Sequence, residues 1–218
     1  NSSDEHLVAG TYEKLYYVNP SLTVTDITPS SGFTSGSING ALNTGFGGGF
    51  YGLNNYGRTP ANSGVYAEAT TWALDTWGEY LLAVSSTDGK LLEWQGNVNA
   101  NAATVANAPT GNNSMVVTEE RFVFCLGAGG NPRKVAWSDK ENNTVWNATA
   151  TNEAGDMELQ TTGQIMCGVR MRGATLILTD TDAHVATYSG APFVYGFQRV
   201  GTACGVASRK GAVAIDEG

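Results

Sequence analysis

The sequence is poor in the residue types from which many functional sites are built. Its 218 residues include two histidines, three cysteines and six prolines, and only 15% of them are charged. No apolar run approaches the roughly 18 to 20 residues that a membrane-spanning helix needs, so we expect no membrane partner. His6 and His184 do not form a pair at metal-ligand spacing, which argues against a zinc site. We therefore expect neither a bound metal nor a cofactor.

Positive charge is also scarce. The chain carries 12 Lys and Arg against 20 Asp and Glu, which gives a net charge of −8. Its basic residues are scattered in small groups, such as Arg133-Lys134 and Arg209-Lys210, and apolar segments separate them. Affinity for nucleic acid comes largely from clustered Lys and Arg. This distribution argues against a phosphate-binding surface built by one chain alone.

The three cysteines cannot all be paired with one another. Cys125, Cys167 and Cys204 each lie between small or apolar neighbours. A chain that uses cysteine in this way is typical of a reducing compartment, where the thiols serve as small apolar groups. The sequence predicts three buried, reduced cysteines.

Strand signals dominate what is present. Short runs rich in aromatic and β-branched residues alternate with Gly, Asn, Asp and Pro, which is the pattern of an all-β protein. The predicted strands are 14–18, 22–27, 80–85, 90–94, 115–118, 121–126, 133–137, 164–171, 174–179, 183–188, 193–200 and 205–207. Residues 99–107 are Ala-rich and fit either a short helix or a loop.

A hairpin pattern recurs along the chain. Three pairs of strands, centred on Leu82, Val123 and Ile177, share an apolar first strand and a second strand that ends in an aromatic residue: Trp94, Trp137 or Tyr188. Residues 14–27 form a shorter fourth member, and 211–215 could open a fifth. Repeats of this size, with two to four strands each, are typical of a β-propeller, in which successive blades pack face to face. We therefore predict a propeller or partial propeller of antiparallel blades, with the three aromatics capping successive layers; a β-sandwich with similar hairpins is the alternative.

Residues 30–66 interrupt this pattern with a long segment rich in Gly, Ser and Asn. Aromatic residues are spaced along it, and they are costly to leave in water. We interpret this loop insertion as a docking element, and it contacts either its own domain or a neighbouring subunit. The candidate inter-subunit contacts are Phe46, Phe50, Tyr51 and Tyr56.

Catalytic constellations are hard to find. His184 follows Asp180 and Asp182, but no Gly-x-Ser-x-Gly element supplies a nucleophile. We interpret His184 as a strand histidine at a blade edge. The carboxylate groups at 119–120, 139–141 and 180–182 would suit calcium or glycosidase chemistry, but Asp and Glu at such positions commonly accept hydrogen bonds from turns. We expect no catalytic residue and no enzyme activity.

Several stretches, taken together and in order, resemble tail proteins of tailed bacteriophages. The similarity is to the β-propeller nozzle, or tail tubular, family of short-tailed phages, and it covers most of the chain. The matching segments are 9–11, 14–16, 25–29, 72–83 (WALDTWGEYLLA), 107–109, 135–139 (VAWSD) with Trp146, Ala154-Gly155 and Leu159, then 176–180 (LILTD), 190–192 and 200–205 (VGTACG).

The resemblance implies a structural role without an active site. Such a protein would be located in the virion tail, would assemble in the cytoplasm of the host bacterium, and would form part of the DNA ejection channel. It implies a homo-oligomeric ring, with a hexamer as the candidate, that meets other tail proteins or the portal and adaptor proteins. Viral DNA would pass through the channel without specific binding, and an acidic wall would repel it.

The sequence is also compatible with two other functions. A glycan-binding propeller or adhesin would use exposed Trp77, Trp94 or Trp146 to stack on sugars, and a hydrolase would need a carboxylate pair in a cleft. We expect residues 1–218 to form one propeller-like domain, and we interpret the chain as a fragment of a longer one because it lacks an initiator Met and ends directly after a strand-like segment.

Overall fold

The computed structural model describes residues 7–42 and 66–214. Within these ranges the protein is built from antiparallel β-sheets, and one 3-10 turn, Ala128–Gly130, is the single helical element. This confirms the all-β prediction. The described residues include no helix with the length and hydrophobicity that a bilayer crossing requires.

Four sheets follow one another along the chain, and each contains only consecutive strands. The first sheet consists of β1 (Leu7–Gly10), β2 (Leu15–Val18) and β3 (Val24–Asp26). The second consists of β6 (Trp72–Trp77), β7 (Tyr80–Ser85), β8 (Leu91–Trp94) and β9 (Ala103–Thr104). The third consists of β10 (Ser114–Val117), β11 (Val123–Leu126), β12 (Lys134–Trp137) and β13 (Gly155–Glu158). The fourth consists of β14 (Ile165–Met171), β15 (Ala174–Thr179), β16 (Asp182–Gly190) and β17 (Val194–Thr202).

Two tight turns show why these strands fold back on themselves. Gly78 joins β6 to β7, and Gly173 joins β14 to β15, in each case through a two-residue loop. Their φ angles are 69° and 71°, in the left-handed region that residues with a Cβ rarely adopt. Two-residue hairpin loops with the twist of the flanking strands require such angles. Glycine at these two positions therefore fixes the register of both hairpins.

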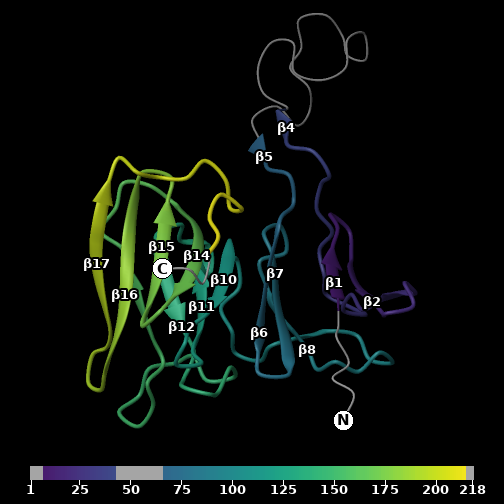
Figure 1. The fold of residues 1–218 in the computed structure, drawn as a ribbon, viewed down its shortest axis with the longest axis horizontal. Coiled ribbons are helices and arrows are strands. Elements are labelled where there is room, and N and C mark those ends of the chain that lie inside the picture. Colours follow the sequence, from purple (N-terminus) through teal and green to yellow (C-terminus); the bar gives the residue numbers. More distant parts are fainter. Residues whose placement is uncertain (1–6, 43–65, 215–218) are drawn as a thin grey trace, which may run out of the picture.

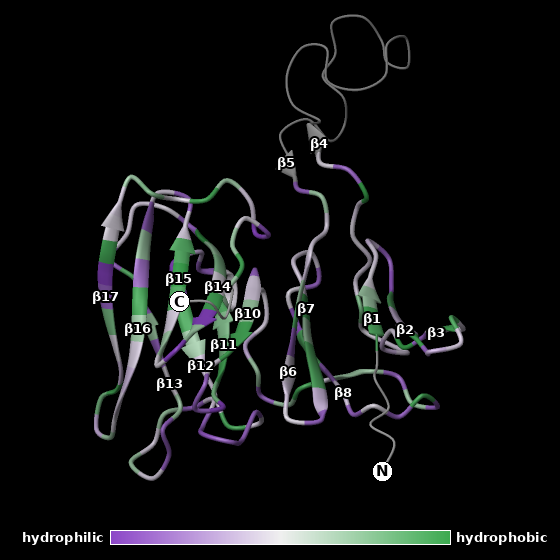
Figure 2. Cartoon of the chain, in the orientation of Figure 1, coloured by the Kyte–Doolittle hydropathy of each residue, from purple (hydrophilic) through white to green (hydrophobic). Residues whose placement is uncertain are grey.

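The sheets stack in chain order, from β1–β3 at one end of the molecule to β14–β17 at the other (Figure 1). The first strands of the last three sheets lie next to one another, since β10 contacts both β6 and β14. Hydrophobic residues are concentrated in the strands and hydrophilic residues in the turns (Figure 2). Each sheet thus covers an apolar face of its neighbour.

Three apolar clusters fill the three interfaces between neighbouring sheets. The cluster between the first and second sheets includes Leu15, Tyr17, Trp72, Leu92 and Trp94. The cluster between the second and third sheets includes Leu82, Val84, Leu91, Met115, Val117, Val123 and Cys125. The cluster between the third and fourth sheets includes Phe122, Phe124, Val135, Trp137, Ile177 and Tyr195.

The hairpins predicted from the repeat are present, and their centres Leu82, Val123 and Ile177 lie in the second strands of successive sheets. The prediction that the closing aromatics cap successive layers is wrong. Trp94 faces the first sheet, whereas Trp137 and Tyr188 pack in the same interface, between the third and fourth sheets. A shift of one residue along a strand moves a side chain to the opposite face, so equivalent sequence positions do not imply equivalent layers.

Other strand predictions need correction. Residues 205–207 and 212–214 form no strand; they belong to an irregular C-terminal segment, 203–214. Residues 99–107 form a loop that contains the two-residue strand β9. Strands β1, β6 and β13 were not expected from the periodicity, because β1 is short, β6 carries mixed polarity, and β13 is largely exposed.

The predicted insertion 30–66 is only partly separate from the body. Its first described residues run along the first and second sheets, where the Phe33 ring stacks on Trp72 with centroids 5.7 Å apart. The segment then enters a two-stranded ribbon of β4 (Ala41–Leu42) and β5 (Tyr66–Ala67), which lies away from the four sheets (Figure 1). The insertion is thus anchored on the body at its N-terminal side.

Candidate assembly surfaces

The aromatic residues predicted to contact a neighbouring subunit, Phe46, Phe50, Tyr51 and Tyr56, lie outside the described residues. The structure shows instead how the ribbon before and after them is fixed. The backbone N–H of Gly36 donates to the Tyr12 carbonyl at 2.7 Å, and that of Ser37 donates to Thr70 Oγ1 at 2.9 Å. The base of the ribbon is therefore tied to both the first and the second sheet.

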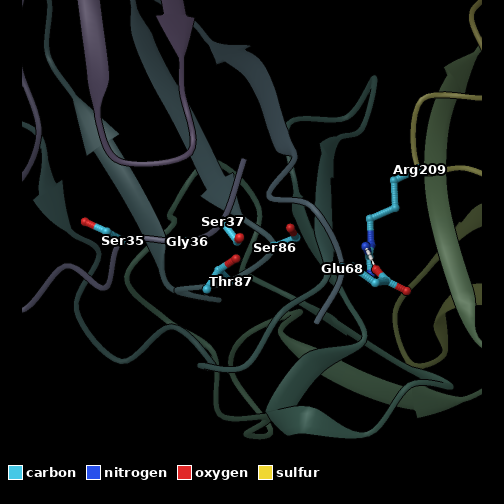
Figure 3. A pocket seen from close by; sticks show the side chains of 7 residues that line it. All are labelled: Ser35, Gly36, Ser37, Glu68, Ser86, Thr87 and Arg209. Atoms are coloured by element: carbon cyan, nitrogen blue, oxygen red, sulfur yellow. Dashed lines mark hydrogen bonds and ion pairs between the residues drawn. The ribbon is translucent and has the colours of Figure 1, made fainter. Parts of the chain in front are cut away.

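A cavity of about 310 Å³ lies beside this base (Figure 3). Hydroxyl groups and one ion pair line it, from Ser35, Ser37, Ser86, Thr87, Glu68 and Arg209, together with Gly36. Because the Arg209 guanidinium is paired with the Glu68 carboxylate, the lining carries no net charge. The cavity therefore offers no excess charge to attract an ion.

The Arg209–Glu68 ion pair fastens the C-terminal segment 203–214. This segment leaves β17 and returns over the fourth sheet, where the backbone N–H of Val206 donates to the Thr179 carbonyl at 2.9 Å. Val206 and Ala212 pack against the sheet face that points away from the third sheet. Arg209 then reaches Glu68, just before β6. The end of the described chain is thus held next to the start of the second sheet.

A polar seam runs beside the aromatic core between the third and fourth sheets. Tyr195 Oη donates a hydrogen bond to Glu120 Oε2 at 3.1 Å and lies 3.0 Å from Thr118 Oγ1. Burial raises the pKa of the Tyr195 phenol, and the Glu120 carboxylate raises it further. Nearby, Tyr188 Oη donates to the Glu153 carboxylate at 3.1 Å. These bonds join the two sheets in addition to their apolar contacts.

Asp182 and His184, which lie two residues apart in the sequence, meet at the other end of this interface. Asp182 Oδ1 accepts hydrogen bonds from Thr161 Oγ1 at 2.9 Å and from Thr179 Oγ1, and it lies 3.2 Å from His184 Nε2. Burial pushes the pKa of Asp182 upward, but these hydrogen bonds and His184 outweigh it and hold the pKa below its usual range. Among the described residues, no cysteine or serine side chain is hydrogen-bonded to His184.

His184 thus occupies a strand, as predicted, but that strand is not an edge. It lies in β16, between β15 and β17, and it is buried. Its partner Asp182 organises the turn from β15, because Thr179 Oγ1 also accepts the backbone N–H of Asp182 at 2.8 Å. The pair is therefore built into the sheet as a structural element.

The tryptophans that would serve glycan stacking do not lie open to solvent. Trp94 is 3% exposed and Trp146 is 8% exposed, and both belong to the clusters between sheets. Trp77 is half-buried beneath the Arg121 guanidinium, which lies 5.4 Å from its ring centroid. These three rings are committed to contacts within the protein.

The carboxylate groups singled out in the sequence accept hydrogen bonds from the chain itself. Glu119 accepts a hydrogen bond from the backbone N–H of Gly173. Asp139 accepts one from the backbone N–H of Glu153, and Asp180 accepts one from the backbone N–H of Gln164. In the part of the chain that the structure describes, no group of three or more His, Cys, Asp or Glu side chains is placed to hold a metal ion. These carboxylates therefore accept hydrogen bonds from the backbone, as the sequence analysis expected for Asp and Glu in turns.

Two of the three cysteines are buried, and the third is not. Cys125 lies between the second and third sheets, and Cys167 lies under the C-terminal segment. Burial raises the pKa of both thiols. Cys204 is exposed, which corrects the prediction that it is buried, because the segment that carries it forms no strand.

Comparison of the sequence with models of known protein families, and with curated proteins, finds no match.

Proposed function

We propose that this chain is a structural virion protein of a bacteriophage tail, and that it serves as a nozzle or tail-tube subunit that forms part of the DNA ejection channel. The observation that carries the proposal is the succession of antiparallel sheets, each packed face to face on the next, with the first strands β6, β10 and β14 adjacent. This is the arrangement expected for consecutive propeller blades. It agrees with the family resemblance in the sequence.

In this proposal each sheet is one blade, and the first strands face the propeller axis. Equivalent strands then occupy equivalent distances from the axis, and the three apolar clusters are the inter-blade layers. The two-residue hairpins at Gly78 and Gly173 join the first and second strands of their blades. Such a body is rigid, because every layer is a packed apolar core.

Assembly into a ring requires contact surfaces on the outside of this body. Leu7 and Val24, on the outer side of the first sheet, are 62% and 59% exposed. Exposed apolar side chains that gather on one face are typical of protein contact sites. We assign this face of the first sheet to contacts with neighbouring subunits or with other tail, portal or adaptor proteins. The net charge of −8 suits a channel wall along which DNA slides without adhering.

The test is single-particle imaging of the protein produced together with the tail proteins encoded beside it, followed by imaging of each protein alone. A closed ring with an axial pore that contains this chain is the expected result. A monomer in every mixture would contradict the proposal.

A pair of matched variants tests the assigned face. Val24→Lys places a charge on the outer side of the first sheet, whereas Val98→Lys places the same charge in a loop of the second. Both side chains are exposed, so both variants should retain the thermal stability of the parent. Loss of rings with Val24→Lys alone supports the assignment, and equal ring formation by both variants contradicts it.

A further inference from the structure

A groove opens at the outer margin of the interface between the third and fourth sheets. Its volume is about 370 Å³. The third-sheet side contributes Met157, Leu159 and Gln160, and the fourth-sheet side contributes His184, Phe197 and Arg199. The groove continues the aromatic core outward, because Tyr195, Phe197 and Arg199 follow one another at every second position of β17 and point to the same face.

A β-bulge lies beside Arg199 in β17. In the register of β16 and β17, Ala183 pairs with Gly201 but His184 pairs with Arg199, so Val200 is the extra residue. Arg199 keeps the regular alternation of Tyr195 and Phe197 and lies opposite His184 on the groove face. Bulges are frequent next to functional sites.

Arg199 has hydrogen-bonding capacity to offer a ligand. Its side chain is 53% exposed, and its Nη1 atom lies 4.0 Å from Asp182 Oδ2, beyond hydrogen-bond distance. Asp182 directs its other oxygen to Thr161, Thr179 and His184. Within the described residues the guanidinium therefore forms an ion pair with Asp182 but no hydrogen bond, and its exposed N–H groups can donate to the carboxylate of a ligand.

Beside Arg199, Gln160 and His184 the groove carries apolar side chains that are partly open to solvent. Met157 is 43% exposed, and the Phe197 ring is only partly covered by the core behind it. Methionine adapts its shape to varied apolar partners. A branched apolar side chain would fit between Met157 and Phe197, with an acidic group beside it on Arg199.

The backbone around the groove suits an extended ligand. Both sides end in a terminal strand, β13 and β17, and neither has a further strand neighbour in the described part of the chain (Figure 2). Unpaired edge groups can bond to an added extended segment. We propose that this groove binds an extended peptide segment of a partner protein in which a Leu or Ile residue stands two positions from an Asp or Glu, so that both side chains point into the groove. The inference does not depend on the tail role, because it rests only on the groove.

The probe is a fluorescein-labelled synthetic peptide of nine residues, Leu-Ser-Asp-Ser-Leu-Ser-Asp-Ser-Leu, whose leucines and aspartates all point to one face when the peptide is extended. The control peptide carries lysine in place of each aspartate. Fluorescence anisotropy measures binding to the full chain, and ¹³C-methyl methionine NMR locates it. We expect the signal of Met157 to move and that of Met115, buried between the second and third sheets, to stay.

Matched variants separate the role of Arg199 from a general effect of charge. Arg199→Gln and Arg172→Gln each remove one positive charge, but Arg172 lies in the exposed turn between β14 and β15. We expect Arg199→Gln to weaken binding about tenfold, in line with the loss of a charge-assisted hydrogen bond, and Arg172→Gln to leave it unchanged. Met157→Asp, at a position open enough to tolerate the change, should also weaken it by charge repulsion.

Several results would overturn the proposal. They are the absence of binding at millimolar peptide, equal affinity for the lysine peptide, and equal affinity of the Arg199→Gln and parent proteins. A shift of the Met157 signal by an oligosaccharide of uronic acids, with none by the peptide, would replace the peptide with an acidic sugar as the ligand.

Discussion

Tyr195 and Glu120 join the fourth sheet to the third by a hydrogen bond of 3.1 Å between the phenol oxygen and the carboxylate. The bond lies beside an aromatic cluster in which the Tyr195 ring meets Phe124 edge to face, with centroids 4.7 Å apart. One side chain therefore supplies both an apolar and a polar contact between two sheets. Removal of the hydroxyl separates the two contributions.

Tyr195→Phe should lower the free energy of unfolding by about 1 to 3 kcal/mol, because the variant keeps the ring but leaves Thr118 and Glu120 without their partner. Urea denaturation monitored by tryptophan fluorescence measures the change. Tyr16→Phe is the control, since Tyr16 is half-buried on the outer face of the first sheet. Equal free energies of unfolding for the two variants would show that the hydrogen bonds of Tyr195 do not stabilise the protein.

Asp182→Asn should destabilise the protein at neutral pH by about 1 to 3 kcal/mol, through the loss of a charged acceptor for Thr161, Thr179 and His184. The pKa of Asp182 is lower in the folded protein than in the unfolded chain. Its contribution to stability is therefore complete above the unfolded pKa and is lost as the pH falls through the folded one.

The pH dependence distinguishes this electrostatic effect from a general loss of packing. Urea unfolding at pH 7 and at pH 3 should show a large difference between the parent and Asp182→Asn at the higher pH and a smaller one at the lower. A difference that stays constant over this range would indicate that the carboxylate charge is not responsible.

In thiol labelling, one of the three cysteines should react rapidly and the other two slowly. Cys204 is exposed, whereas Cys125 and Cys167 are buried with raised pKa values, so their thiolate forms are scarce. With a chromogenic disulfide reagent at pH 8, we expect one equivalent to react rapidly in the native protein and three in denaturant. Cys204→Ser should abolish the rapid phase; its persistence would place an exposed thiol elsewhere.

Arg209→Gln should loosen the C-terminal segment without unfolding the sheets. The substitution breaks the ion pair with Glu68, while the three clusters between sheets do not contain Arg209. Hydrogen exchange measured by mass spectrometry should become faster in residues 203–214 and stay unchanged in β11. Lys210→Gln is the control, because Lys210 makes no ion pair within the described residues.

The sequence was most informative where short apolar runs lie between turn residues. Most of the second and third strands of the last three sheets are such runs, and the repeat therefore found them. It missed β13, whose GDME sequence is mostly polar because three of its four residues are exposed at the edge of a sheet. The sequence shows Asp182 two residues before His184 but does not indicate that the two side chains meet. Arg199 could not be predicted to join them, because its place opposite His184 depends on the register of β16 with β17.

The separation of the apolar clusters into three interfaces has a consequence for folding. Every sheet is made of consecutive strands, and each interface joins sheets that are neighbours in the chain. Each sheet can therefore form as soon as the ribosome releases it and then dock on the sheet made before it. Stability in such an array is the sum of the individual units and their nearest-neighbour contacts. A destabilising substitution in β1–β3 would consequently leave the β14–β17 sheet folded. Unfolding would begin at the end sheets of the stack and proceed inward.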